Sequence, residues 1–160
     1  MKRPVIGDDL ALALARAPMA AAIAAAKLVG RGDERAADQA AVDAMRATLN
    51  TLAIRGRVVI GEGERDNAPM LYVGEEVGAG DGPELDIATD PLEGTTLAAK
   101  AKGNALSVAA FAPRGGLLHA PDVYMDKIAI GPGYENGIID LDRGVDENVI
   151  ALARAKGVKP

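Results

Sequence analysis

The chain is expected to adopt an α+β fold, with N-terminal helices layered on a mostly antiparallel sheet. Two long Ala-rich segments with apolar residues at helical spacing come first, and short apolar and β-branched runs separated by Gly and Pro follow. The 160 residues and 49% hydrophobic content suffice for a single domain, residues 1–160. Only 2% of the residues are aromatic, so small aliphatic side chains must build the core.

The two predicted helices span residues 8–29 and 36–54. The first is expected to end at Gly30 and to be kinked or split by Pro18, which lacks a backbone N–H. Asp33 is expected to cap the second helix. Asp38 is placed in the first turn of that helix, where the helix dipole favours a carboxylate.

The rest of the chain is expected to be mainly strands. Predicted strands span 57–60, 71–77, 85–89, 105–111 and 124–130. One helical turn is expected at 96–100, and a final helix over 145–156 with Gly157 at its C′ position.

Composition excludes several classes of function. The net charge of -5 argues against nucleic acid or an anionic membrane as a partner. The absence of cysteine excludes disulfides, zinc–thiolate sites and cysteine nucleophiles. Neither a secretory signal nor a run of about 18 uninterrupted apolar residues is evident, so a cytoplasmic protein is expected.

The most informative segment is Asp-Pro-Leu-Glu-Gly-Thr-Thr, residues 90–96. Pro91 suits the second position of a type I turn, which would bring Asp90 and Glu93 within about 7 Å of each other. Gly94 allows a close backbone approach to a ligand, and Thr95 supplies a hydroxyl where a short helix could bind phosphate. An ordinary Asp-Pro turn that binds nothing is the alternative interpretation.

A second acidic cluster, Gly-Glu-Gly-Glu-Arg-Asp at residues 61–66, follows the strand at 57–60. If the two strands are neighbours, Glu62, Asp90 and Glu93 meet at one edge of the sheet. Converging carboxylates repel one another unless cations lie between them, which is typical of a Mg²⁺ or Mn²⁺ site. A solvated Gly-Glu turn is the simpler alternative. His119, the only histidine, is expected to be structural or surface-exposed rather than a ligand.

Residues 90–95 match the signature of the lithium-sensitive, metal-dependent phosphatase superfamily. Four further blocks together resemble the class II, GlpX-type fructose-1,6-bisphosphatases: residues 30–33, 59–64, 68–72 and 120–125. The resemblance runs from about residue 20 to the C-terminus, and it implies the N-terminal domain of such a sugar phosphatase.

The resemblance also implies roles for individual residues. Divalent cations, Mn²⁺ or Mg²⁺, would be bound by Asp38, Glu62, Asp90 and Glu93. Glu93, Gly94, Thr95 and Tyr124 would contact the substrate. Catalytic roles fall on Asp38, Asp66 and Thr95, with Thr95 helping to activate the attacking water.

The implied activity is metal-dependent hydrolysis of the 1-phosphate of fructose-1,6-bisphosphate, in gluconeogenesis or the Calvin cycle. Similar enzymes also accept sedoheptulose-1,7-bisphosphate. Two departures stand out: Glu34 occupies a position that is often lysine, and the chain is expected to lack the family's C-terminal α/β substrate domain.

A catalytically incomplete N-terminal fragment is therefore the alternative hypothesis, in which the chain binds cations or only assembles with its missing half. A phosphatase for another substrate, such as an inositol phosphate, is a third. An uncovered apolar domain face would favour a homo-oligomer.

Overall fold

The computed structural model describes residues 6–61, 71–119 and 123–160, and the chain divides into two compact units, residues 1–121 and 122–160. The second unit contains the helix α4 (Val145–Lys156). The first unit contains, in chain order, α1 (Asp8–Ala26), α2 (Glu34–Leu49), β1 (Arg55–Ile60), β2 (Glu76–Val77), β3 (Glu84–Glu93), α3 (Thr95–Ala99) and β4 (Leu106–Pro113). The predicted α+β class is confirmed.

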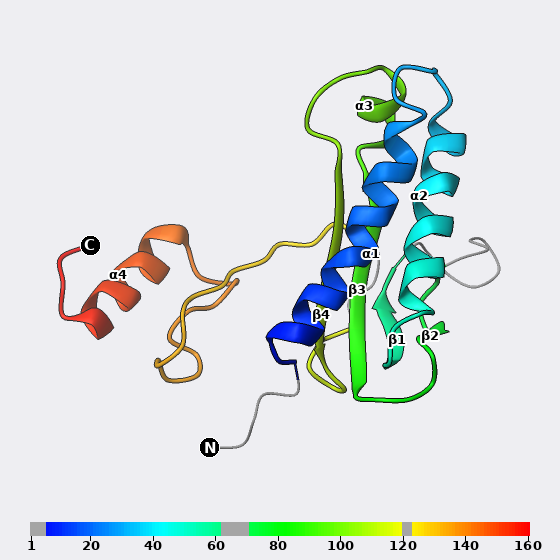
Figure 1. The fold of residues 1–160 in the computed structure, drawn as a ribbon. Coiled ribbons are helices and arrows are strands. Elements are labelled where there is room, and N and C mark those ends of the chain that lie inside the picture. Colours follow the sequence, from blue (N-terminus) through cyan, green and yellow to red (C-terminus); the bar gives the residue numbers. More distant parts are fainter. Residues whose placement is uncertain (1–5, 62–70, 120–122) are drawn as a thin grey trace. The chain divides into compact units, whose positions relative to one another are not determined.

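The four strands form one sheet in the order β2-β1-β3-β4. β1 pairs with β2, and β3 with β4, in antiparallel fashion, whereas β1 and β3 run parallel, so the sheet is mixed. α1 and α2 lie side by side over one face of this sheet (Figure 1). The opposite face, here called the open face, carries no helix of the first unit within the described residues.

The core lies between the two helices and the sheet, and small side chains dominate it. Met45, Leu49, Ile54, Leu85 and Ile87 are fully buried. The buried positions of the two helices are largely alanines: Ala17, Ala21, Ala25, Ala37 and Ala41. Side chains this small let the two helix backbones approach closely, which replaces the aromatic bulk that the composition lacks.

The expectation that Pro18 splits the first helix is wrong, because α1 is one continuous helix. Ala17, which precedes Pro18, and Ala21, which lies about one turn after it, are both completely buried. Packing on both sides of the proline therefore holds the helix together, although Pro18 removes one backbone hydrogen bond.

Three other predictions need correction. The second helix ends at Leu49 rather than at 54, and the side chain of the next residue, Asn50, accepts a hydrogen bond from the Gly78 backbone N–H at 3.0 Å. The strand predicted at 71–77 is reduced to Glu76–Val77, because residues 72–75 form a turn closed by the Glu75 N–H and the Tyr72 carbonyl at 3.0 Å. The strand predicted at 124–130 does not form, because the described sheet ends at β4 and offers this segment no pairing partner.

In the second unit, α4 ends as predicted. Gly157 is left-handed, with φ +67°, and the Val158 N–H reaches back to the Ala153 carbonyl at 3.0 Å. The buried side chain of Asn148 holds the preceding loop, donating to the carbonyls of Asp140 and Arg143 and accepting from the Asp140 N–H. Helix and loop therefore form one folded piece.

The capping role of Asp33 is confirmed, because its carboxylate accepts a hydrogen bond from the Ala36 N–H at 2.9 Å. Asp33→Ala should lower the free energy of unfolding by about 1 kcal/mol, the usual cost of losing a helix N-cap. Urea denaturation followed by circular dichroism measures the change. Asp81→Ala, in an exposed turn, is the matched control; equal stability of the Asp33→Ala variant and the parent would contradict the capping role.

Candidate active site

Asp90 and Glu93 lie at the end of β3, and they do not form the predicted type I turn. Both belong to the strand, which contains a one-residue bulge: Asp90 is opposite Val108 and Glu93 is opposite Leu106. Two residues of β3 therefore face one residue of β4. Because Leu106 and Val108 are two apart, they share a face of the sheet, and so do their partners Asp90 and Glu93.

The bulge explains how proline fits inside a strand. Pro91 has no N–H to offer, and it lies where the ladder with β4 is interrupted. The N–H of the next residue, Leu92, is accepted by Asp90 Oδ1 at 3.1 Å. Pro91 has no backbone N–H to pair, and the Leu92 N–H is bound by a side chain. The interrupted ladder therefore leaves neither residue with an unpaired backbone donor. The two acids therefore lie on the same face of the sheet through a local structure that differs from the predicted turn.

The next residues form the predicted helical turn, α3. Gly94 adopts φ +84°, a conformation that favours glycine, and its carbonyl accepts hydrogen bonds from Leu97 and Ala98. Thr95 begins α3 and is half-buried, whereas Glu93 is exposed. Glu93, Gly94 and Thr95 therefore follow one another around a sharp change of direction at the end of β3.

α2 reaches the same end of the first unit. The loop that precedes it donates from Gly30 and Gly32 to the carbonyls of Ala98 and Ala99, at 2.9 Å and 3.0 Å, which binds this loop to α3 (Figure 1). Asp38 lies in the second turn of α2 rather than in the first, because the helix already begins at Glu34. It is half-buried, and desolvation raises the pKa of its carboxyl group above the ordinary value.

The remaining predicted ligands, Glu62 and the catalytic candidate Asp66, lie outside the described residues. Among the described residues no group of three or more acids or histidines is close enough to hold a metal ion. The parallel register sets Ile60 of β1 opposite Ala88 of β3. Tyr124 belongs to the second unit and its side chain is fully exposed there.

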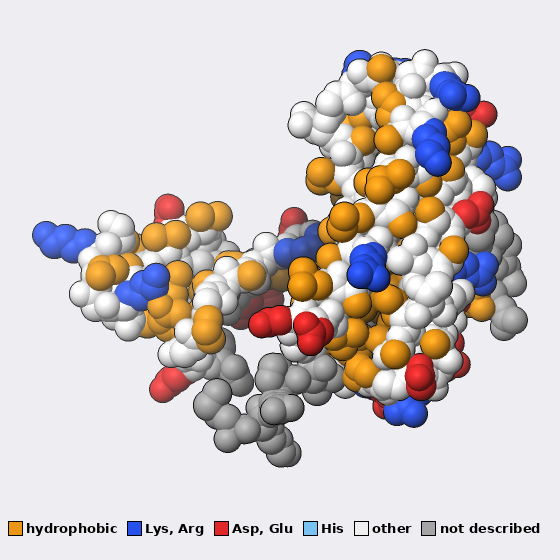
Figure 2. Space-filling model, viewed as in Figure 1, with side chains coloured by type: hydrophobic (Ala, Val, Ile, Leu, Met, Phe, Trp, Pro, Cys, Tyr) orange, Lys and Arg blue, Asp and Glu red, His pale blue; other side chains and the backbone are white. Residues whose placement is uncertain are grey.

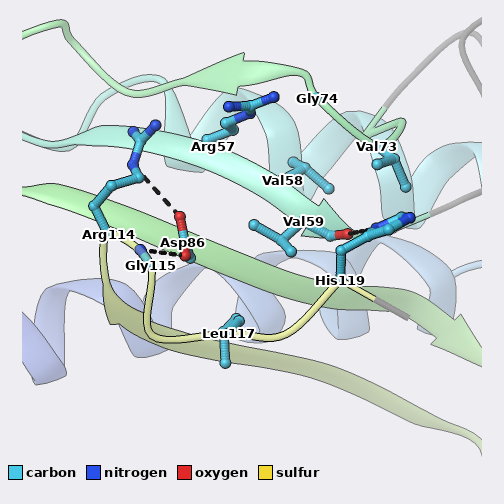
Figure 3. Close-up of a pocket in the computed structure, with 10 residues that line it drawn as sticks. All are labelled: Arg57, Val58, Val59, Val73, Gly74, Asp86, Arg114, Gly115, Leu117 and His119. Carbon is cyan, nitrogen blue, oxygen red and sulfur yellow. Dashed lines mark hydrogen bonds and ion pairs between the residues drawn. The ribbon is translucent and has the colours of Figure 1, made fainter. Parts of the chain in front are cut away.

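A pocket of about 480 Å³ lies on the open face and contains none of the predicted site residues (Figure 3). One wall is the segment 114–119, which leaves β4 and crosses β3 toward β1. Two contacts bind its start to the buried Asp86: Arg114 Nε at 3.4 Å and the Gly115 N–H at 2.7 Å. At its end, His119 Nδ1 is 3.2 Å from the Val59 carbonyl, and His119 is exposed, as expected of a structural histidine.

Two buried carboxylates were not singled out by the sequence. Asp86 is 3% exposed beneath the segment 114–119, and Glu75 is 4% exposed beside Arg46, whose Nε is 2.6 Å from Glu75 Oε1. The alternation of 84–90 predicts Asp86 on the face away from the helices, but no local signal reveals that Arg114 will cover it.

The raised pKa of Asp38 has a consequence for stability. Its folded-state pKa exceeds the ordinary value of 3.8, so the ionised carboxylate opposes folding once the pH rises above that value. Asp38→Asn should therefore unfold at a higher temperature than the parent at pH 7. The difference should vanish below a pH of about 3.8, where both states of the parent are protonated. Calorimetry in EDTA at several pH values measures this; a less stable variant at pH 7 would contradict it.

Comparison with known proteins agrees with this reading of the chain. Residues 8–160 match the family of bacterial fructose-1,6-bisphosphatases that are glpX-encoded. Over 149 residues the chain is 54% identical to fructose-1,6-bisphosphatase 2 class 2 and 50% identical to fructose-1,6-bisphosphatase 1 class 2, both of Escherichia coli (strain K12). A class 2 enzyme of Shigella flexneri is also 50% identical.

These alignments cover 93% of the chain but only 46%, 44% and 44% of the three relatives, so the chain spans less than half of their length. The matched segment nevertheless includes the bulged end of β3, α3 and the whole of α2. By its sequence and by the family model that covers residues 8–160, the chain belongs to the glpX-encoded, class II fructose-1,6-bisphosphatases.

Proposed function

We propose that this chain provides the metal- and phosphate-binding part of a phosphatase that removes the 1-phosphate of fructose-1,6-bisphosphate. The single observation that carries the proposal is the bulge at Pro91. It sets two carboxylates, Asp90 and Glu93, on one face of the sheet immediately before the Gly94–Thr95 turn. Family membership supports the reaction, and this local structure supports the assignment of the two acids and the Thr95 hydroxyl to one site.

The chemistry of the assigned donors favours Mg²⁺ or Mn²⁺, although the described acids alone form no group of three that could hold an ion. Asp38, Asp90 and Glu93 offer only carboxylate oxygens, the ligands that such hard cations prefer. Glu62 is two residues beyond Ile60, and Asp90 is two residues beyond Ala88, the partner of Ile60 in the parallel register. Glu62 lies outside the described residues, and the family resemblance alone assigns it as a further ligand. Bound cations would acidify a water and stabilise the departing alkoxide.

The chain's own residues then have distinct tasks. The Gly94 backbone and the Thr95 hydroxyl hold the phosphate, and Thr95 Oγ1 orients the attacking water. Asp38 or Glu62 accepts the proton from this hydroxyl–water pair, since an ionised carboxylate can act as a general base. Asp66 and Tyr124 are assigned to the same site through the family resemblance alone. Attack is direct, so no phosphorylated residue forms.

The second candidate function is cation binding without catalysis. The observation that favours it is coverage: the alignments leave more than half of each relative unmatched. Sugar recognition and any residues beyond the matched segment would then come from a partner segment. Additional activity on sedoheptulose-1,7-bisphosphate, a cytoplasmic location and self-assembly are further parts of the proposal.

Asp90→Asn tests both candidates in two assays. Titration calorimetry with Mn²⁺ on the 160-residue chain should show binding weakened at least about tenfold, because one anionic ligand is lost. Phosphate release from fructose-1,6-bisphosphate should be measured on a chimera that continues with the unmatched C-terminal part of the E. coli enzyme 2. There the substitution should lower the rate at least about a hundredfold.

Asp81→Asn removes the same charge from an exposed turn and should change neither result. Activity of the chimera but not of the 160-residue chain, with Mn²⁺ bound by both, would favour cation binding without catalysis. Full activity of the Asp90→Asn chimera would refute the proposed site.

A further inference from the structure

Thr89 carries a buried hydroxyl directly before Asp90, and its side chain lies in the helix–sheet core. The residue is only 7% exposed. Its Oγ1 is 3.2 Å from the Val108 carbonyl oxygen of β4 and 2.8 Å from the Met45 sulfur of α2. A hydroxyl has one proton to donate, and a carbonyl oxygen is a better acceptor than a thioether sulfur. The hydroxyl therefore donates to Val108, and the Met45 sulfur packs against it.

This hydroxyl lies in surroundings where an apolar side chain would pack equally well. Met45 is fully buried, and α1 and α2 cover this side of the sheet with many hydrophobic side chains (Figure 2). Valine has nearly the shape of threonine without the cost of burying a polar group, which one hydrogen bond only partly offsets. A polar residue in such a place often meets a requirement other than stability. The partner of the hydroxyl indicates that requirement, because Val108 is the residue opposite Asp90.

The place of the bulge along β3 decides where the two acids point. Between Asp90 and Glu93, two residues of β3 lie opposite the single residue Ser107 of β4. If the extra residue lay before Asp90 instead, the ladder from Asp90 to Glu93 would be regular. The two carboxylates would then point to opposite faces of the sheet, since side chains alternate along a regular strand.

We propose that Thr89 is a positioning residue for the acids of β3. Its hydrogen bond to Val108 fixes the ladder immediately before Asp90 and so keeps the extra residue between Asp90 and Glu93. The inference rests on the proposed function in one respect, namely that these two acids bind a divalent cation. Groups that support metal ligands without touching the metal typically change its affinity by about 10- to 100-fold.

The same side chain connects the bulge to α2. Met45 comes seven residues after Asp38, which is about two helical turns, so the two residues lie on the same side of α2. Thr89 therefore contacts both β4 and the helix that carries Asp38. Ligands of one metal ion must be held to within about 0.5 Å of their required places, so a loosened Thr89 would disturb Asp90 relative to Asp38.

Amide hydrogen exchange in EDTA tests the positioning role without any metal. Thr89→Val removes the hydroxyl and keeps the shape of the side chain. Exchange of the Leu92 amide, which Asp90 Oδ1 accepts inside the bulge, should become about tenfold faster. The Val58 amide, bound to the Glu75 carbonyl, should be unaffected. The melting temperature should change by less than about 5 °C. Equal exchange at Leu92 in variant and parent would overturn the proposal.

Two matched variants separate the hydroxyl from other effects. Ser107→Ala removes a second buried hydroxyl from the same face of the sheet, one that has no hydrogen-bond partner among the described residues. It should leave the exchange of the Leu92 amide unchanged. Thr89→Ser keeps the hydroxyl and loses a methyl group, so it should exchange like the parent at Leu92. Exchange as fast in either variant as in Thr89→Val would contradict the assigned role of the Thr89 hydroxyl.

Titration calorimetry with Mn²⁺ on the 160-residue chain connects the bulge to the cation. Thr89→Val should weaken binding about tenfold, whereas Thr89→Ser and Ser107→Ala should bind like the parent. Weaker binding by Asp90→Asn with unchanged binding by Thr89→Val would overturn this inference and leave the proposed site intact. Unchanged binding by both variants would refute the proposed site, and exchange at Leu92 in EDTA would then decide by itself whether Thr89 holds the bulge.

Discussion

The bulge in β3 is the constraint on which the candidate site depends. In a regular strand Asp90 and Glu93 would point to opposite faces of the sheet, since side chains alternate. One extra residue in β3 reverses this alternation, so both acids lie on the open face, next to the left-handed Gly94. Pro91 makes the arrangement specific: it cannot take part in a regular ladder, and it is fully buried at the point where the ladder is broken.

Much of this architecture could be predicted from periodicity. The two long helices, the end of β1 before Gly61, the short helix after Gly94 and the cap of α4 all follow from local sequence, whereas β3 continues beyond its predicted end at residue 89 to Glu93. The type I turn at residues 90–93 was wrong for a physical reason. Asp-Pro-Leu-Glu is compatible with a turn or with a bulge, and pairing with the distant β4 decides between them. The prediction of a strand at 71–77 was also wrong, because a turn at 72–75 leaves only Glu76–Val77 to pair with β1.

Buried charge was the least predictable feature. Asp38 was placed at a helix end, where solvent and the helix dipole would favour ionisation, but the start of α2 at Glu34 moves it into a half-buried turn. Asp86 and Glu75 are covered by Arg114 and Arg46, which lie 28 and 29 residues away in the sequence, so no window of local sequence contains the pair.

The segment 114–119 is fastened to the sheet by charge and polar contacts rather than by an apolar core. Arg114 is about one-third exposed, so its attraction to Asp86 is partly screened by dissolved ions. The helix–sheet core, made of buried aliphatic side chains, has no such sensitivity. Raised ionic strength should therefore release this crossing segment while the layers beneath it stay folded, and hydrogen exchange would detect that opening first at the Gly115 amide.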